Sequence, residues 1–176
     1  MEKTTGILLR TKKFSETSLL VYWCTNDLGI VHTVARGARR PKSPYSGKLD
    51  LFYTADLAFA RSRKSDLHNL SEVSVLTHRS GIQKDYLRVL AASYFVQLIE
   101  LVAEPEAPIP ELYELLDKAL DFLDEQPCTV RVIERFELRI VQYSGIAEEG
   151  KAPHNTIWDV FGRLPKSRSN LIDLLP

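Results

Sequence analysis

Cysteine is scarce in this sequence, and long apolar runs are absent from it. The only two cysteines, Cys24 and Cys128, lie more than a hundred residues apart, so they can build neither a disulfide framework nor a four-cysteine zinc site. No apolar stretch approaches the roughly 18 residues that a membrane-spanning helix needs, and the first six residues do not form a signal-peptide core. We therefore expect a soluble, cytoplasmic protein that makes no contact with membranes.

Sequence motifs of catalysis are also missing. The chain has no HExxH or GxSxG motif and no GxxxxGK[ST] loop for a nucleotide. Its four histidines are scattered, with no spacing that would pair them as metal ligands: they are His32, His68, His78 and His154. We expect no catalytic residue, no bound metal and no cofactor, and hence a protein that is not an enzyme.

Net charge is zero over the whole sequence but not within its halves. The chain carries 23 basic and 23 acidic side chains. Residues 1–80 hold 13 of the lysines and arginines against 7 acidic residues, whereas residues 81–176 hold 10 against 16. This asymmetry indicates a basic module joined to an acidic one, and a basic module is a candidate for binding phosphate backbones. The alternative is an uneven distribution of solvated surface charge.

The basic half has the pattern of β-strands. Five short segments rich in branched and aromatic residues are separated by turn residues such as Asn26-Asp27-Leu28-Gly29. The segments cover residues 5–11, 18–24, 30–36, about 51–60, and 67–77. Five short strands are too few for a typical sandwich but suit a small closed barrel, of which the OB-fold is the commonest five-stranded case. We predict such a barrel as a nucleic-acid-binding domain over residues 1–79.

After Ser80 the apolar residues recur with helical spacing. A helix from about residue 85 is buried over most of its circumference, with Ser80 and Gln83 as a capping box. A second helix starts at Pro110 and has an acidic outer face, and a third starts after its N-cap Thr129 and ends at Gly145. The side chains of the third helix that we expect to face inward are Ile133, Phe136, Ile140 and Tyr143.

The last thirty residues have a weaker pattern. One short helix is expected at 156–161, followed by a polar stretch through residues 166–170. We therefore predict an α+β fold: an N-terminal five-stranded OB-fold barrel, then a helical bundle domain over residues 80–176 with a partly irregular C-terminal tail.

Basic residues concentrate in the long loop after the third predicted strand. Residues 37–48 contain two prolines and two glycines, too many for a regular element. Five cations lie within the thirteen residues 36–48: Arg36, Arg39, Arg40, Lys42 and Lys48. Such a loop has few ways to bury its cations, and guanidinium groups that face solvent can bind phosphate oxygens. A merely solvated loop is the alternative.

Cations outside this loop extend the patch if the barrel brings the strand ends together. Three of them close the first strand: Arg10, Lys12 and Lys13. Three more lie in the last predicted hairpin: Arg61, Arg63 and Lys64. We count the first three as candidate nucleic-acid-binding residues.

Aromatic side chains are interleaved with these cations. They are Phe14, Tyr22, Trp23, Tyr45, Phe52, Tyr53 and Phe59. Most are expected in the core, but some could stack on bases, because every base has a π-face. Only Tyr45 is singled out as nucleic-acid-binding, since it lies in the basic loop with no strand neighbour to pack against it. A core position for Tyr45 is the alternative.

A second basic feature lies in the third predicted helix. Three arginines recur every four residues and so share one face: Arg131, Arg135 and Arg139. Beside an apolar groove, such a stripe could receive the acidic, hydrophobic end of a partner peptide. The alternative is ion pairing within the domain, with the acidic second helix.

A strand, a turn glycine and an unbroken basic segment follow one another in a specific order. The segment Glu16-Thr17-Ser18-Leu19-Leu20-Val21 leads to Thr25 and Gly29, and residues 34–43 read VARGARRPKS. In this order the segments resemble the RecO family of bacterial DNA repair and recombination-mediator proteins. Residues 90–95 and 135–139 resemble the helical region of that family, so the resemblance covers about residues 4–145.

This resemblance implies an N-terminal OB-fold, a helical domain and a role in the nucleoid. It implies binding of single- and double-stranded DNA, annealing of complementary strands, and loading of RecA, together with RecR and sometimes RecF, onto DNA coated by single-stranded-DNA-binding protein. No nucleotide cofactor is implied. The DNA-binding positions that match the family motif are Arg36, Arg39, Arg40 and Lys42. By the same resemblance, Arg135 and Arg139 lie in the helix that in some members receives the acidic C-terminal tail of single-stranded-DNA-binding protein.

One departure from the family pattern limits the resemblance. Many members carry a four-cysteine zinc module after the helix that corresponds to residues 129–145, whereas no cysteine follows that helix here. We interpret the sequence as a short form without the zinc module, and we predict no zinc. Two other functions stay open from the residues alone: a protein-interaction module whose barrel docks a partner protein, and an RNA-binding OB protein.

Overall fold

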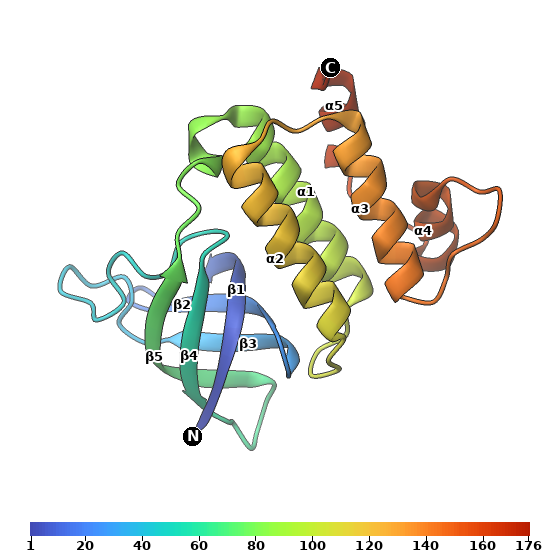
Figure 1. Cartoon of the computed structure of the whole chain (residues 1–176). Coiled ribbons are helices and arrows are strands. Elements are labelled where there is room, and N and C mark those ends of the chain that lie inside the picture. Colours follow the sequence, from blue (N-terminus) through green and yellow to red (C-terminus); the bar gives the residue numbers. More distant parts are fainter. The chain divides into compact units, whose positions relative to one another are not determined.

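Five strands near the N-terminus close into a barrel in this computed structural model, which describes all 176 residues (Figure 1). The strands are β1 (Glu2–Lys13), β2 (Leu19–Thr25), β3 (Gly29–Ala35), β4 (Thr54–Ala60) and β5 (Leu67–Thr77). Their order around the barrel is β1-β2-β3-β5-β4, with all pairs antiparallel except β3 and β5. The predicted five-stranded OB-type barrel is therefore confirmed.

The core of the barrel follows from the alternation of side chains along each strand. In β2, Val21 and Trp23 point inward and are fully buried, and the Trp23 indole Nε1 donates a hydrogen bond of 2.9 Å to Thr33 Oγ1 on β3. That bond satisfies the one polar atom of the largest core side chain. Strand β4 starts three residues later than the sequence predicts, because Phe52 takes a left-handed conformation (φ 69°) and residues 51–53 form a turn.

A segment distant in sequence completes the barrel unit. Two compact units divide the chain: residues 1–78 with 104–113, and residues 79–103 with 114–176. The Glu106 backbone N–H donates to the Ile30 carbonyl (3.1 Å), so residues 104–107 lie beside the start of β3. Gly29 must be glycine here, because its φ is 73° and a Cβ would come within 2.8 Å of the Ala107 carbonyl oxygen.

Helices make up the second unit, although the first four residues of α2 belong to the barrel unit. They are the 3-10 turn η1 (Ile82–Lys84), α1 (Tyr86–Val102), α2 (Pro110–Glu125), α3 (Val130–Tyr143), α4 (Pro153–Phe161) and α5 (Ser167–Leu174). The predicted start of α2 at Pro110 and the Thr129 N-cap of α3 are confirmed. The predicted capping box is wrong, because Asp85, and not Ser80, caps α1 by accepting from the Leu87 and Arg88 N–H groups. Tyr143 was also expected inward, yet it is exposed near the end of α3.

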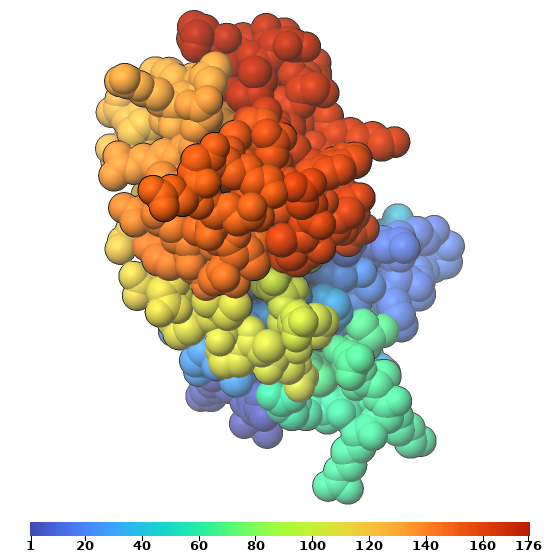
Figure 2. All heavy atoms as spheres, turned by 90° about the vertical axis from the view of Figure 1, so that its right-hand side faces the viewer, coloured from blue at the N-terminus to red at the C-terminus, as the bar shows by residue number.

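The residues after α3 are more regular than their sequence indicates. Both α4 and α5 form there, and Figure 2 shows α3, α4 and α5, in orange to red, packed against one another on one face. The Arg168 side chain reaches Glu137, a carboxylate of α3 with no exposed surface, at 2.5 Å from Nε to Oε1. Tyr94 of α1 donates to the same oxygen at 2.7 Å. A buried, hydrogen-bonded ion pair thus anchors α5, a helix that weak local propensity alone does not predict.

No helix of the structure combines the length and the apolar character needed to cross a bilayer. Nor do three or more histidine, cysteine, aspartate or glutamate side chains gather in an arrangement that could hold a metal ion.

Candidate nucleic-acid interface

The loop between β3 and β4 is built from consecutive turns. Its first part, residues 36–48, contains the five predicted cations and is called the cationic loop below. Backbone hydrogen bonds between residues three apart run along it, from Arg40 N to Gly37 O (3.0 Å), from Ser43 N to Arg40 O (3.1 Å) and from Lys48 N to Tyr45 O (3.0 Å). The loop therefore holds one shape through its own backbone, although it is not a helix or strand.

Most cations of the cationic loop face solvent. Arg36, Arg39, Arg40 and Lys42 are exposed, and Lys48 is half-buried. The Arg36 guanidinium Nε donates to the side-chain amide oxygen of Asn69 on β5 (3.2 Å), and none of the five forms an ion pair with a carboxylate. Positive charge that carboxylates do not neutralise is what a phosphate backbone requires.

Arg39 joins the cationic loop to the loop between β1 and β2. Its Nη1 donates to the carbonyl oxygens of Ser15 (3.2 Å) and Glu16 (3.0 Å), and its backbone N–H donates to Thr17 O (3.0 Å). The Gly37 N–H adds a weaker bond to Ser18 Oγ (3.4 Å). The two loops are thus one connected surface, in which part of the Arg39 guanidinium is used to hold the loops together.

The cations at the end of β1 lie directly before this junction. Lys12 is exposed, and Lys13 pairs with Glu16 within the β1–β2 loop at 2.8 Å. The Arg10 guanidinium carbon lies 3.5 Å above the centre of the Tyr22 ring, its register partner on β2. Lys12 and Lys13 therefore lie next to the β1–β2 loop that Arg39 joins to the cationic loop, while Arg10 packs on an aromatic face of the barrel wall.

Tyr45 does not belong to this surface. It is only 8% exposed, packs into the barrel core, and its hydroxyl donates to the Leu70 carbonyl oxygen at 2.9 Å. Burial raises the pKa of the Tyr45 hydroxyl. The expectation that Tyr45 lacks a strand neighbour is wrong, because the cationic loop folds back so that Tyr45 enters the barrel core. Ala38 of the same loop and the following Leu49 pack against that core.

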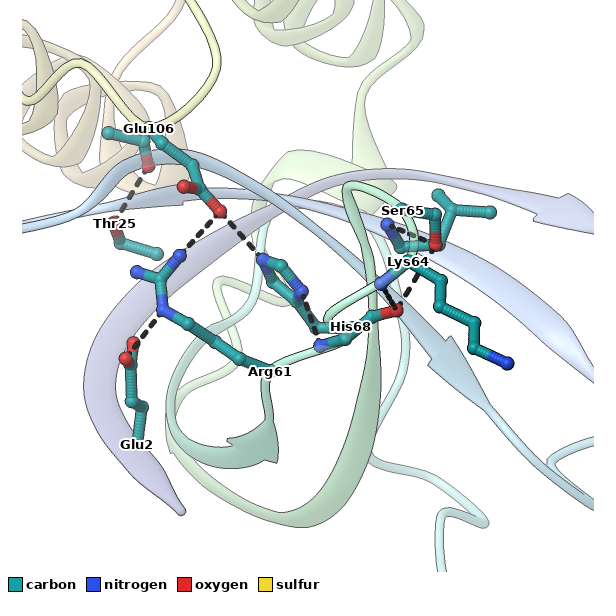
Figure 3. A network of polar contacts seen from close by, with 10 residues as sticks. Glu2, Thr25, Arg61, Lys64, Ser65, His68 and Glu106 are labelled. Carbon is teal, nitrogen blue, oxygen red and sulfur yellow. Dashed lines mark hydrogen bonds and ion pairs between the residues drawn. The ribbon is translucent and has the colours of Figure 1, made fainter.

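The hairpin between β4 and β5 contributes less charge than expected. Figure 3 shows Arg61 held between two carboxylates: its Nε lies 2.5 Å from Glu2 and its Nη1 lies 2.7 Å from Glu106. The buried His68 also contacts Glu106, at 2.7 Å from Nε2. The Arg61 guanidinium, and next to it His68, lower the pKa of the Glu106 carboxyl. Arg61 is therefore occupied within the barrel, whereas Arg63 and Lys64 remain exposed.

The predicted arginine stripe is a separate feature of α3. Arg131, Arg135 and Arg139 are all exposed, and only Arg139 has a polar partner, Gln142 on the same helix (3.1 Å). None pairs with α2. The acidic residues Asp117 and Asp121 of α2 instead bind Arg79, whose guanidinium is buried, at 2.6 and 2.8 Å. Leu138 lies between Arg135 and Arg139 in sequence and is also exposed.

One residue of the joined loops was named among the interleaved aromatic residues but was not singled out from the sequence. Phe14 follows Lys13 at the start of the β1–β2 loop and is 52% exposed. The available signal was its context, since Ser15-Glu16-Thr17-Ser18 after it is turn-forming and polar and so offers no apolar partner. The same kind of context surrounds Tyr45, which is nevertheless buried, so this signal alone does not separate the two residues.

Comparison with known proteins adds independent information to this geometry. The family model described as Recombination protein O N terminal matches residues 1–79, and the model described as Recombination protein O C terminal matches residues 83–149. These two matches coincide with the barrel strands and with η1 to α3.

Curated relatives carry a consistent name. The chain is 32% identical to "DNA repair protein RecO" of Syntrophus aciditrophicus over 145 residues, which is 82% of this chain and 56% of the relative. It is 32% identical over 149 residues to the protein of that name from Cyanothece sp., covering 84% of this chain and 50% of the relative. For Anaeromyxobacter sp. the identity is 34% over 145 residues, with coverage of 82% and 56%. The chain spans about half the length of these relatives, and it belongs to the recombination protein O (RecO) family.

Proposed function

We propose that this protein binds DNA without sequence preference in recombinational repair, anneals complementary strands, and helps load RecA onto DNA coated by single-stranded-DNA-binding protein. We propose no catalytic step for it, and we place its action on nucleoid DNA in the cytoplasm. The observation that carries the proposal is the joined pair of loops, whose exposed cations Arg36, Arg40 and Lys42 have no carboxylate partner. Family membership supports the repair context.

The physical problem in annealing is repulsion between two phosphate backbones. A positive surface that holds both strands lowers this repulsion for long enough that base pairs can nucleate. The cationic loop suits this task because its backbone bonds and the Arg39 junction hold it in one shape before DNA arrives. Little conformational entropy is then lost on binding.

Some of the residues we assign to the DNA-binding surface contact DNA, and others support the loops that carry those contacts. Arg36, Arg40, Lys42, Lys12 and Lys13 are assigned to phosphate contacts, because all five are exposed on or beside the joined loops. Of these, Lys13 would exchange its exposed ion pair with Glu16 for a phosphate. Two further cations, Arg39 and Lys48, are assigned mainly to supporting the loops. Arg10 is kept as a contact at the edge of the surface. Tyr45 is removed from the DNA-binding set, because its ring is in the core.

A partner surface is assigned to α3. Its exposed arginines flank the exposed Leu138, a combination of charge and apolar area that suits an acidic, hydrophobic peptide such as the tail of single-stranded-DNA-binding protein. RecR, and in some settings RecF, are proposed as further partners on the strength of the family alone.

Salt dependence tests the DNA-binding proposal. If about five basic residues contact single-stranded DNA, the logarithm of affinity should fall with a slope of roughly −3.5 against the logarithm of salt. Binding should then weaken on the order of a hundredfold between about 50 and 200 mM salt. The double variant R40E/K42E should weaken binding and reduce the slope by about 1.4, measured by fluorescence anisotropy of a labelled oligonucleotide. A flat salt response in the unmodified protein would refute the proposal.

A matched double variant separates the proposal from its rivals. R135E/R139E should keep DNA affinity and lose binding of the acidic tail peptide, whereas R40E/K42E should do the reverse. Unchanged DNA affinity with lost capture of a partner in R40E/K42E would favour a barrel that docks proteins. Competition between RNA and DNA of equal length addresses RNA binding, because the 2′-hydroxyl is the group that would distinguish them.

A further inference from the structure

Phe14 is an apolar ring placed among cations. It follows Lys12 and Lys13 directly, and it lies on the loop that Arg39 ties to the cationic loop. Half of its surface is exposed, at 52%. Single exposed apolar residues are common and by themselves indicate nothing; Phe14 differs in the cations beside it and in the hydrogen bonds that hold its loop.

The support beneath Phe14 is rigid for so short a loop. The Phe14 and Ser15 N–H groups both donate to the Ser18 carbonyl oxygen, at 3.0 and 3.3 Å, and the Ser18 N–H donates back to Ser15 Oγ at 3.1 Å. The Arg39 guanidinium then holds the Ser15 and Glu16 carbonyl oxygens from the other loop. The backbone that carries the ring is therefore held in place by the protein's own hydrogen bonds, while half of the apolar ring stays exposed to solvent.

We infer that Phe14 stacks on an unpaired base of the single-stranded DNA whose phosphates the joined loops bind. The inference rests on the proposed function for its ligand, and it adds a preference for single strands. Stacking on an aromatic ring tolerates every base, as binding without sequence preference requires. Duplex bases are already stacked on one another, so the ring contributes nothing to duplex affinity unless the duplex opens.

Arg39 is, on this view, a positioning residue. Its Nη1 group donates to the Ser15 and Glu16 carbonyl oxygens and is therefore not available to a phosphate. These bonds hold the loop that carries Phe14 next to the cationic loop. The ring and the cations then act on neighbouring parts of the same nucleotide chain.

Substitution of Phe14 tests the inference directly. F14A should weaken binding of a single-stranded oligonucleotide about tenfold, because a stacked base is lost. Duplex affinity and the salt slope should not change, since no charge is removed. F14Y should bind as the unmodified protein does, and F14L should resemble F14A, because leucine keeps apolar volume without a π-face. L76A is the matched control: Leu76 is 55% exposed on β5 of the same unit, and its loss should leave affinity unchanged.

A crosslinking measurement on the unmodified chain does not depend on any variant folding. Irradiation of a bromouracil-substituted single strand should place the crosslinked base on Phe14, mapped by mass spectrometry of the peptides. Crosslinks confined to other residues, or equal losses of single-strand and duplex affinity in F14A, would overturn the inference. Those outcomes differ from failure of the proposed function itself, in which R40E/K42E leaves both affinities unchanged.

Discussion

Two aromatic residues of the barrel unit illustrate how single side chains reach opposite environments. Tyr45 lies in a loop of prolines, glycines and cations, yet it is buried with its hydroxyl satisfied by Leu70 O. Phe14 lies at the end of the longest strand, yet its ring is half exposed. The difference does not follow from sequence neighbours, since both residues lie in polar segments; Tyr45 is buried because it meets β5, where Leu70 is 25 residues away. Only one of the two can therefore meet DNA.

The buried hydroxyl of Tyr45 gives a prediction at this scale. Y45F should lower the free energy of unfolding by about 1 kcal/mol, because the Leu70 carbonyl loses its donor while the ring still fills the core. DNA affinity should be unchanged. Urea denaturation and anisotropy titration measure the two quantities. The control is Y53F, since Tyr53 contacts His78 through its ring rather than its hydroxyl. The urea midpoint of Y53F should equal that of the unmodified protein. Weakened DNA binding by a folded Y45F variant would contradict the removal of Tyr45 from the DNA-binding residues.

Among the helical elements, α2 contacts the turn that precedes α1. Its acidic face is not simply solvated: Asp117 and Asp121 bind the buried Arg79, and Asp124 Oδ1 accepts from the Gly81 N–H at 2.6 Å. The acidic side chains that the sequence pattern places on the outer face of α2 thus bind the turn before α1 and hold it in place.

The close contact between Gly81 and the backbone of α2 gives the prediction for this element. A Cβ at Gly81 would lie 2.0 Å from the Asp124 carbonyl oxygen, whereas its backbone (φ −67°, ψ −30°) suits any residue. G81A should therefore destabilise the protein by about 1–3 kcal/mol through overpacking alone. The midpoint of urea unfolding measures this, with S80A at the exposed neighbouring position as the control. An unchanged midpoint would mean that the turn moves away from α2 without cost.

On the scale of the whole chain, the barrel unit is discontinuous. Residues 104–113 return to it after α1, and Glu106 links them to the barrel through Arg61 and the buried His68 (Figure 3). A boundary drawn only from sequence near residue 79 leaves this returning segment out. The domains proposed for DNA and for partners are therefore not independent stretches of chain.

Removing the carboxylate of Glu106 tests this link. E106A should cost about 1 kcal/mol, a modest value because Glu106 is partly exposed, and should speed amide exchange in β3 more than in α3. Since its pKa is lowered in the folded state, the contribution of Glu106 is present above its ordinary value of 4.5 and is lost as pH falls through the folded pKa. The difference from the unmodified protein should shrink accordingly in acid. E104A, two residues away and exposed, is the control.

Much of the fold was predictable because it rests on local pattern. Branched and aromatic runs around Val21 and Val31 indicate strands, and the apolar positions Ile133, Phe136 and Ile140 indicate the buried face of α3. Helix α5 was not predictable in this way, because its anchor is the pair between Arg168 and Glu137, 31 residues apart. The charge of the cationic loop was evident from composition, but the bonds that Arg39 makes were not.

The sequence by itself determined the order and type of most elements, the concentration of positive charge in residues 36–48, and the family to which the chain belongs. Only the tertiary structure decided which side chains of that loop meet solvent, which arginines are occupied, and where residues 104–113 go. The physical reason is that element type follows from neighbours a few positions apart. Burial and ion pairing depend instead on which distant residues the closed barrel and the packed helices bring into contact.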